Sequence, residues 1–338
     1  MSIKLNRSML RAAFGRLFFS AVLFLMFINV ITGACLLGGC SRKQAVITPP
    51  VVEEKKEDPA DRQAAAEKIA GYAHPEALIS VYELNQKIYD TSIFTLDTRG
   101  RSYEVFLKSY RYGHIPGAVP ILHESYTHPK YTDRIATPPQ LQDVLGGLGA
   151  DNESTVVLYG NDGLQARLFW AMRMYGYDNV KILDGGLDKW KEAGYDITSA
   201  NSVRPPDTFE FDLARSKMEL LATLNEVEAA IGNPNNVIVD TRSRDEYLYK
   251  HIPGSINFFY AELLNKDLTF KSASDLKALA ENKKITPDKK IIVYCDSGVD
   301  SSLVWFAFSQ LLGYPNVKNY DGSLNEWLKM DRKTQSGE

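Results

Sequence analysis

The sequence predicts an α/β protein made of two homologous domains, each a parallel sheet with helices on both faces. The chain has 338 residues, of which 44% are hydrophobic and 24% charged, which is enough material for two globular domains of ordinary size. Landmarks of the first half recur in the second half at a nearly constant distance. Short apolar runs alternate with stretches of helical periodicity, and this alternation is typical of parallel sheets covered by helices.

The internal repeat consists of several landmarks that occur twice in the same order. They are Leu96-Asp97-Thr98-Arg99 with Val239-Asp240-Thr241-Arg242, Gly113-His114-Ile115-Pro116-Gly117-Ala118 with Lys250-His251-Ile252-Pro253-Gly254-Ser255, Val156 to Gly160 with Ile291 to Cys295, and Asp184-Gly185-Gly186 plus Trp190 with Asp321-Gly322-Ser323 plus Trp327. The offsets are 143 for Asp97 to Asp240, 137 for His114 to His251, 135 for Gly160 to Cys295 and 137 for Trp190 to Trp327. We therefore expect one domain over residues 76–200, a linker over 201–217, a second domain over 218–332 and a tail over 333–338.

The N-terminal segment is typical of an export signal. Four basic residues, Lys4, Arg7, Arg11 and Arg16, precede a mostly apolar stretch from Leu17 to Leu37. The sequence Leu37-Gly38-Gly39-Cys40 resembles a bacterial lipobox, which predicts a signal peptide over residues 1–39 and lipidation of Cys40. An uncleaved membrane anchor is the alternative, because about 20 apolar residues can span a bilayer. Either interpretation places the body of the protein in the cell envelope.

The expected location follows from the same segment. A lipid anchor would hold the protein on the periplasmic face of a membrane, and Ser41 after the lipidated cysteine favours the outer membrane if the cell is Gram-negative. Residues 40–75 are polar and mixed in charge, so we expect a flexible tether there, with a short helix around Asp61 to Ala70. This location would also allow a protein partner in the envelope.

Secondary structure in the second domain can be placed from periodicity. We expect helices over residues 223–231, 275–281 and 302–312, the last ending at Gly313, and strands over 237–239 and 291–294. In parallel sheets, ligands bind beyond the carboxyl ends of the strands. Cys295 directly follows the strand over 291–294, so it lies where a site is expected.

Cys295 is the candidate nucleophile. The chain has three cysteines, and cleavage before Cys40 with lipidation of that residue would leave Cys295 as the one free thiol. It opens a loop, Asp296-Ser297-Gly298-Val299-Asp300-Ser301-Ser302, between a strand and a helix. Backbone N–H groups and a helix N-terminus at such a turn favour the thiolate. At the equivalent place in the first domain stands Gly160, so the scaffold does not need the thiol.

Taken in order, Asp-x-Arg, Gly-His-Ile-Pro-Gly-Ala, Tyr-Cys with a glycine three residues later, and Asp-Gly-Gly with a tryptophan resemble the tandem rhodanese, or sulfurtransferase, family. The resemblance covers about Leu78 to Leu328. It implies that Cys295 takes a sulfane sulfur from a small donor of the thiosulfate or 3-mercaptopyruvate type, forms a persulfide, and passes the sulfur to a thiol or cyanide. The loop amides from Ser297 to Ser302 would stabilise the anion. No cofactor or metal is expected.

The charge of the loop leaves the donor open. Asp296 and Asp300 flank the thiol, the loop has no cation, and two carboxylates should repel thiosulfate and raise the thiol pKa. The loop is partly similar to that of 3-mercaptopyruvate sulfurtransferases, which bind a carboxylate through arginines, so Arg242 and Arg244 are candidate substrate-binding residues. Asp240 with Arg242 is more simply a structural ion pair, and His114 and His251 are more simply packed turn residues.

Three functions remain open from the sequence. The first is an envelope sulfurtransferase that uses Cys295, and the second is a lipid-anchored rhodanese-like module that binds a partner or carries sulfur with little turnover. The third is a cysteine phosphatase or arsenate reductase, which needs an arginine six residues after the cysteine, where this chain has Ser301. Nucleic acid is not an expected partner. Removing the four basic residues of the signal leaves 35 basic and 42 acidic residues, a net charge of −7.

Overall fold

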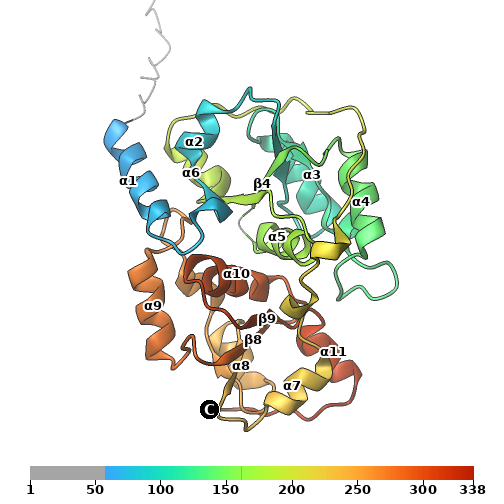
Figure 1. Cartoon of the computed structure of the whole chain (residues 1–338), viewed down its shortest axis with the longest axis vertical. Helices are drawn as coiled ribbons and strands as arrows, with labels where there is room; N and C mark the ends of the chain where they lie inside the picture. The colour runs from blue at the N-terminus through green and yellow to red at the C-terminus, as the bar shows by residue number, and fades with distance from the viewer. Residues whose placement is uncertain (1–57, 161) are drawn as a thin grey trace, which may run out of the picture. The chain divides into compact units, whose positions relative to one another are not determined.

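The structure, a computed structural model, describes residues 58–160 and 162–338. The predicted signal peptide over residues 1–39, the lipidation residue Cys40 and the first part of the expected tether lie outside the described residues. Within the described part, no helix is long and apolar enough to cross a membrane. The described residues form two parallel sheets and the helices that cover them (Figure 1).

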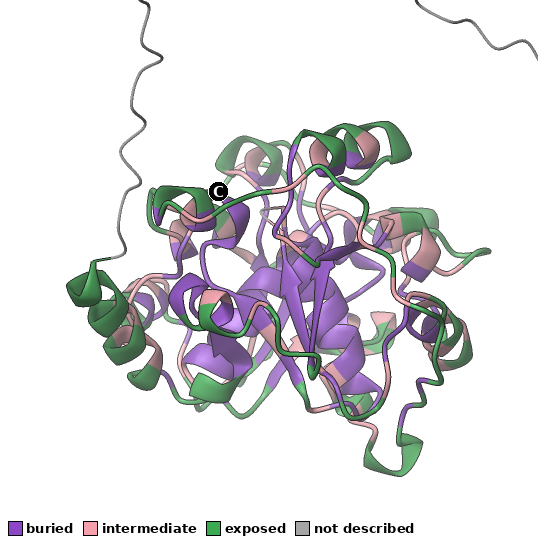
Figure 2. Ribbon diagram, turned by 90° about the horizontal axis from the view of Figure 1, so that it is seen from above, coloured by how far each residue is buried: buried purple, intermediate pink, exposed green. Residues whose placement is uncertain are grey.

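The N-terminal domain is built on a parallel sheet with the strand order β1-β5-β4-β2-β3. Its strands are β1 (Leu78–Ile79), β2 (Ile93–Asp97), β3 (Val119–Pro120), β4 (Thr155–Tyr159) and β5 (Val180–Leu183). Its helices are α2 (Val81–Gln86), α3 (Tyr103–Tyr112), α4 (Pro138–Gly147), α5 (Leu164–Met174) and α6 (Gly186–Glu192). In Figure 2 the strands are buried in the centre, while helices expose their outer faces. Every residue of β2 is buried, as expected for a strand covered on both faces.

The C-terminal domain repeats this plan with a parallel sheet of order β7-β6-β8-β9. Its strands are β6 (Asn236–Asp240), β7 (Ile256–Asn257), β8 (Lys290–Tyr294) and β9 (Val317–Asn319). Its helices are α7 (Leu224–Ala230), α8 (Arg244–Tyr249), α9 (Ala273–Asn282), α10 (Asp300–Phe306) and α11 (Ser323–Lys329), with a π-helical turn over Ala307–Leu311. The fifth strand is reduced to a single bridge between Leu221 and Asn319.

The predicted fold class is confirmed, and the predicted elements of the second domain are present. The helix expected over 223–231 is α7, where Thr223 and Glu226 form a reciprocal capping box. The helix expected over 302–312 begins two residues earlier, as α10, and continues through the π-helical turn to Leu311; Gly313 follows with a φ of +68°, which suits a glycine. Both strands are one to two residues longer than predicted, because the polar residues Asn236, Asp240 and Lys290 at their ends also pair in the sheet, and polar residues do not belong to the hydrophobic pattern.

Three boundary segments pack more closely than expected. The helix expected around Asp61 to Ala70 is present as α1 (Pro59–Ala70), but the segment is not a flexible tether up to residue 75, because Tyr72 beyond the helix is 4% exposed. In the expected linker, Phe209 and Phe211 are buried. In the expected tail, Gln335 pairs with His251, as Thr198 pairs with His114 in the first domain. Apolar side chains and backbone groups of these segments pack against the two domains or pair with them. The mostly polar composition of the segments does not indicate this packing.

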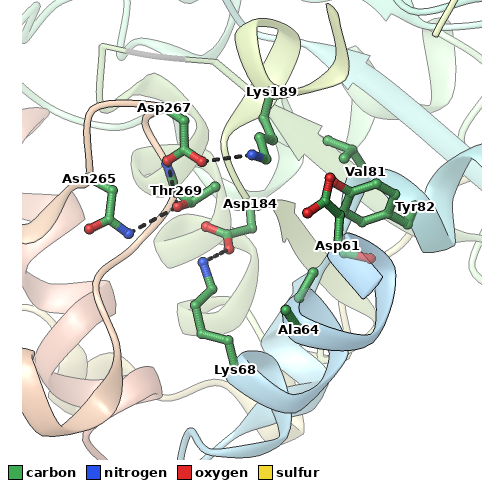
Figure 3. A pocket seen from close by; sticks show the side chains of 12 residues that line it. Asp61, Ala64, Lys68, Val81, Tyr82, Asp184, Lys189, Asn265, Asp267 and Thr269 are labelled. Atoms are coloured by element: carbon green, nitrogen blue, oxygen red, sulfur yellow. Dashed lines mark hydrogen bonds and ion pairs between the residues drawn. The ribbon is translucent and has the colours of Figure 1, made fainter. Parts of the chain in front are cut away.

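Helix α1 contacts both domains through Lys68. Its ammonium lies 2.6 Å from the Asp184 carboxylate of the N-terminal domain and donates to the Phe270 carbonyl of the C-terminal domain at 3.1 Å. Figure 3 shows Lys68 and Asp184 beside a second ion pair, Lys189 with Asp267, around a cavity of about 240 Å³. Asp184 also accepts a hydrogen bond from the Phe270 amide at 2.8 Å. The helix therefore joins the two domains.

Candidate active site

Cys295 stands at the carboxyl end of β8, directly before the loop that leads to α10. The equivalent loop of the N-terminal domain joins β4 to α5, and α5 packs against α10 (Figure 1). We call residues 295–302 the cysteine loop. The two loops meet: a Cβ on Gly163 would lie 3.1 Å from the Val299 carbonyl and 3.4 Å from the Asp300 Cα. The predicted site is therefore formed where the two domains touch.

The cysteine loop curls its backbone amides round the sulfur. Cys295 is a free thiol, 1% exposed, and the Gly298 amide donates to its Sγ at 3.1 Å. The amides of Ser297 and Ser301 also point to the sulfur and lower its pKa. The Ser301 hydroxyl lies 3.7 Å from Sγ, but its stronger bond is to Asn319 Oδ1 at 2.7 Å. Amides in this arrangement form an anion-binding concavity.

Gly298 is needed for this arrangement. Its φ of +76° is in the left-handed region, and a Cβ there would lie 2.6 Å from the Asp321 carbonyl oxygen and 2.7 Å from Asp321 Oδ1. No side chain fits in that space without moving the backbone. The sequence contains this glycine in the loop, but the contact that excludes a Cβ comes from the loop after β9.

The loop is fixed from outside by polar residues at the end of β9 and directly after it. Asn319 donates through Nδ2 to Ser302 Oγ at 3.0 Å and to the Gly298 carbonyl at 3.3 Å. Ser302 Oγ donates to the same carbonyl at 2.6 Å. The Cys295 amide donates to Ser323 Oγ at 3.2 Å. These groups are buried and satisfied, so they hold the loop rigidly.

The pKa of the Cys295 thiol is raised, first by burial and then by the Asp300 carboxylate, which outweigh the loop amides that lower it. The expectation that the loop favours the thiolate is therefore correct for the amides and wrong for the net shift. The expectation that the carboxylates raise the pKa is correct for Asp300. Burial dominates because the sulfur has almost no contact with water.

The two loop carboxylates have different partners. Asp296, half exposed, accepts from Arg242 Nη1 at 3.2 Å and so lies on the side of its own domain. Asp300, whose side chain is 17% exposed, pairs with Arg101 of the N-terminal domain at 2.5 Å. Burial raises the pKa of both carboxyl groups, and the arginine beside each one lowers it.

Arg242 and Arg244, predicted as candidate substrate-binding residues, lie in different surroundings. Arg242 is 6% exposed and holds Asp240 through Nε and Nη2, at 3.0 and 2.6 Å, and the Lys250 carbonyl at 2.7 Å. Arg99 holds Asp97 and the Gly113 carbonyl in the same way, so the predicted structural ion pair is present in both domains. Arg244 is half exposed, ion-paired with Glu338. Neither makes a hydrogen bond to Cys295 among the described residues.

The histidines and tryptophans of the repeat are structural, as expected. His114 and His251 are buried, stack on Tyr110 and Tyr247, and bond through Nδ1 to the carbonyls of those tyrosines at 2.9 and 2.8 Å. The buried Trp190 and Trp327 donate to the backbone. In the part of the chain that the structure describes, no group of three His, Cys, Asp or Glu residues could hold a metal ion.

Arg167 joins the N-terminal domain to the cysteine loop. It projects from α5, is 1% exposed, and donates through Nη1 to the Ser297 carbonyl. Its Nη2 lies 2.9 Å from Asp321 Oδ1, and Asp321 in turn accepts from the Ile135 amide at 2.7 Å. The pair Arg167 and Asp321 thus fixes both the cysteine loop and the loop that supports Gly298.

Gly160 does not leave an empty copy of the cysteine loop. A Cβ at this position would lie 2.6 Å from Thr98 Oγ1 and 2.8 Å from Gln165 Oε1. Gln165, which is 6% exposed, stands where Asp300 stands in the second domain and fills the space beside Gly160. The N-terminal domain therefore supports the site from across the interface instead of forming a second one.

Sequence reasoning missed Arg101, Arg167, Asn319 and Asp321 as site residues. Arg167 had a signal: it is a charged residue inside the apolar run of α5, and a buried charge needs a partner. Asp321 was seen only as a repeat landmark. Arg101 had no such signal, because nothing in its local sequence indicates that its side chain reaches the other domain.

Three comparisons with known proteins agree with this geometry. The family described as "Rhodanese-like domain" matches residues 80–193 and 223–330. A relative from Thermus thermophilus named "Sulfur carrier protein TtuD" is 35% identical over 281 residues, which is 76% of this chain and 95% of the relative. A protein of Haloferax volcanii named "Putative thiosulfate sulfurtransferase" is 35% identical over 244 residues, 66% of this chain and 83% of the relative.

A solved structure shares the fold. The anaerobic ergothioneine biosynthesis enzyme from Chlorobium limicola superposes with a TM-score of 0.69 at 24% identity, over 79% of this chain and 72% of that chain. The family match and the named relatives support sulfurtransferase activity. With two matched regions and one cysteine loop, this chain belongs to the rhodanese-like family and carries two rhodanese-like domains in tandem.

Proposed function

We propose that this protein is a sulfurtransferase in which Cys295 carries the transferred sulfur as a persulfide. The observation that carries the proposal is the ring of amides round Sγ, with the Gly298 amide at 3.1 Å and those of Ser297 and Ser301 directed to the same atom. Such a ring stabilises a sulfur anion, whether thiolate or persulfide.

The reaction needs no group beyond those in the site and the two substrates. With thiosulfate as donor, the Cys295 thiolate attacks the outer sulfur, a new S–S bond forms, and sulfite leaves with the electron pair of the broken S–S bond. Cyanide or a thiolate then attacks the terminal sulfur of the persulfide, and Cys295 leaves as thiolate. Neither leaving group requires a general acid.

A sulfur-carrier role with little turnover is the second candidate. It is favoured by the burial of Cys295, the raised pKa of its thiol and the carboxylate of Asp300. A thiol that is mostly protonated at neutral pH reacts slowly with small donors. The name of the relative from Thermus thermophilus points to the same role.

Phosphatase or arsenate chemistry has less support. The position six residues after the cysteine holds Ser301, which is fully buried and bonded to Asn319. The cysteine loop therefore offers a phosphate or arsenate no arginine of its own at the position that clamps the oxygens in those enzymes.

The experiment is to incubate the protein with thiosulfate or 3-mercaptopyruvate and measure its intact mass. A gain of one sulfur that is absent in Cys295→Ser, followed by its loss to cyanide, supports the enzyme. A stable gain that neither cyanide nor dithiothreitol removes supports the carrier. No gain with either donor, in a protein whose thiol also fails to react with maleimide, contradicts both.

We also propose that the protein acts in the cell envelope, on the periplasmic face of a membrane, through a lipid on Cys40. The sequence Leu37-Gly38-Gly39-Cys40 after an apolar stretch supports this. Cys40→Ala should release the protein from the membrane fraction. If the variant stays bound, the apolar stretch is the anchor.

A further inference from the structure

The cysteine loop is negatively charged, and so are the small sulfur donors considered for its reaction. Between Cys295 and Ser302 it carries Asp296 and Asp300 and no basic residue. Thiosulfate, which carries a sulfonate-type oxygen group, and 3-mercaptopyruvate, which carries a carboxylate and leaves as pyruvate when its C–S bond breaks, are both anions, and an anion is repelled by carboxylates in a partly buried site. A cation for the donor has to come from outside the loop.

Arg101 of the N-terminal domain is placed to supply it. It lies between Gly100 and Ser102, the N-cap of α3, and reaches the other domain. Its Nη2 donates to Asp300 Oδ1 at 2.5 Å and to the Asp162 carbonyl at 2.9 Å. Its side chain is 47% exposed. Among the described residues, Nε and Nη1 have no acceptor, so these donors remain available to a ligand.

Three other polar groups lie close enough to Arg101 to interact with it electrostatically: His123, Tyr126 and Tyr260. Burial, then Arg167 and Arg101, lowers the pKa of His123 to about 4, so this ring is neutral at physiological pH. The Tyr126 hydroxyl is fully buried and has no partner among the described residues. Burial and then the Asp300 carboxylate raise the pKa of Tyr260. The Arg101 guanidinium is also close enough to Cys295 to interact with its thiolate.

We propose that Arg101 recognises the donor: it binds the anionic oxygen group, sulfonate or carboxylate, of the molecule whose sulfur Cys295 attacks. Asp300 holds the guanidinium in place through Nη2, while Nε and Nη1 meet the donor oxygens. The inference deepens the proposed sulfurtransferase function and rests on it for the nature of the ligand. It gives the N-terminal domain, which has no thiol in its own loop, a direct part in donor binding.

Alkylation of Cys295 tests the anion site without any sulfur transfer. Iodoacetate and iodoacetamide react with the same thiolate and differ in charge, so the ratio of their rate constants measures the attraction of an anion to the thiol. In Arg101→Gln we expect this ratio to fall roughly fivefold, because Asp300 is left without its cation. In Asp300→Asn the ratio should rise by about the same factor, and the double variant should return close to the wild-type value.

A matched control is Arg215→Gln. Arg215 is exposed and ion-paired with Asp178, away from the cysteine loop, so the ratio of the two alkylation rate constants in this variant should equal that of the wild type. Because the Arg101 side chain is half exposed, its replacement should leave the thermal unfolding midpoint within error of the wild type. A ratio in Arg101→Gln equal to that of the control, or a shift of the same sign in both single variants, overturns the proposal. Failure of either reagent to label the wild-type thiol at pH 9 overturns it as well.

Donor kinetics separate the two ligand chemistries. For whichever donor is used, Arg101→Gln should raise KM about tenfold with a smaller change in kcat, and Arg101→Lys should restore part of the loss. A rise for thiosulfate alone identifies the sulfonate, and a rise for 3-mercaptopyruvate alone identifies the carboxylate. If no donor gives a persulfide but the alkylation ratios shift as stated, the sulfurtransferase proposal fails and the anion site stands. If a persulfide forms but the ratios do not change, the sulfurtransferase proposal stands and the anion site fails.

Discussion

Arg167 and Asp321 form the buried ion pair on which the cysteine loop depends, and replacing Arg167 by methionine should destabilise the protein strongly. Both side chains are about 1–2% exposed, and the arginine also holds the Ser297 carbonyl. Removing one partner of a buried pair leaves an uncompensated charge and costs about 3–5 kcal/mol. Replacing both partners, in Arg167→Met with Asp321→Asn, should recover most of this cost.

The stability loss of Arg167→Met should depend on pH, because the variant leaves the Asp321 carboxyl buried without its cation. Burial raises the pKa of the Asp321 carboxyl, and Arg167 opposes this shift. Without the arginine the folded-state pKa rises further above the unfolded value, so stability is intact at low pH and is lost as pH rises through the folded-state pKa. Each additional unit of pKa adds about 1.4 kcal/mol to the loss. The destabilisation of Arg167→Met should therefore be larger at pH 8 than at pH 5.

The measurement is the free energy of unfolding in urea at the two pH values. Lys68→Met is the matched comparison, because Lys68 pairs with the equivalent carboxylate, Asp184, but is 22% exposed. Water can replace it in part, so its loss should lower the free energy of unfolding by less than the loss of Arg167 does. Equal losses in the two variants, or no recovery in the double variant, would refute the reasoning. Arg167→Lys, which keeps the charge, should retain stability better than Arg167→Met but form persulfide more slowly.

Three further outcomes are expected. Gly298→Ala should lose about 2–4 kcal/mol of unfolding free energy and most persulfide formation, because its φ is positive and the added Cβ clashes with Asp321. The control Gly232→Ala has a φ of +72° but open space around it, so it should lose only about 1–2 kcal/mol. The rate of Cys295 alkylation by iodoacetamide should still be increasing above the ordinary thiol pKa of about 8.5, and a plateau below pH 8 would contradict the raised pKa. Gly160→Cys should gain no sulfur in the mass assay, because Thr98 and Gln165 fill the space that its Cβ needs; a second persulfide would show that the N-terminal loop can still act.

The charge environment of the thiol shows where sequence reasoning stopped. The carboxylates at 296 and 300 were evident, and so was the absence of a cation in the loop. Each carboxylate has an arginine partner, but one arginine is 54 residues before Asp296 and the other is 199 residues before Asp300. No local pattern connects residues so far apart. Arg242 meets Asp296 because β6 and β8 are neighbours in one sheet, and Arg101 meets Asp300 because the two domains pack together.

The sequence by itself determined the α/β class, the duplication, the strand that ends at Tyr294 and the loop position of the candidate nucleophile Cys295, because these follow from local periodicity and from repeated landmarks. Only the tertiary structure decided the electrostatics. The thiol pKa is raised because the folded interface excludes water from the sulfur, and the cation beside it is Arg101 because the two domains meet at their loops. Burial and long-range ion pairs are properties of packing, and a pattern of neighbours along the chain does not contain them.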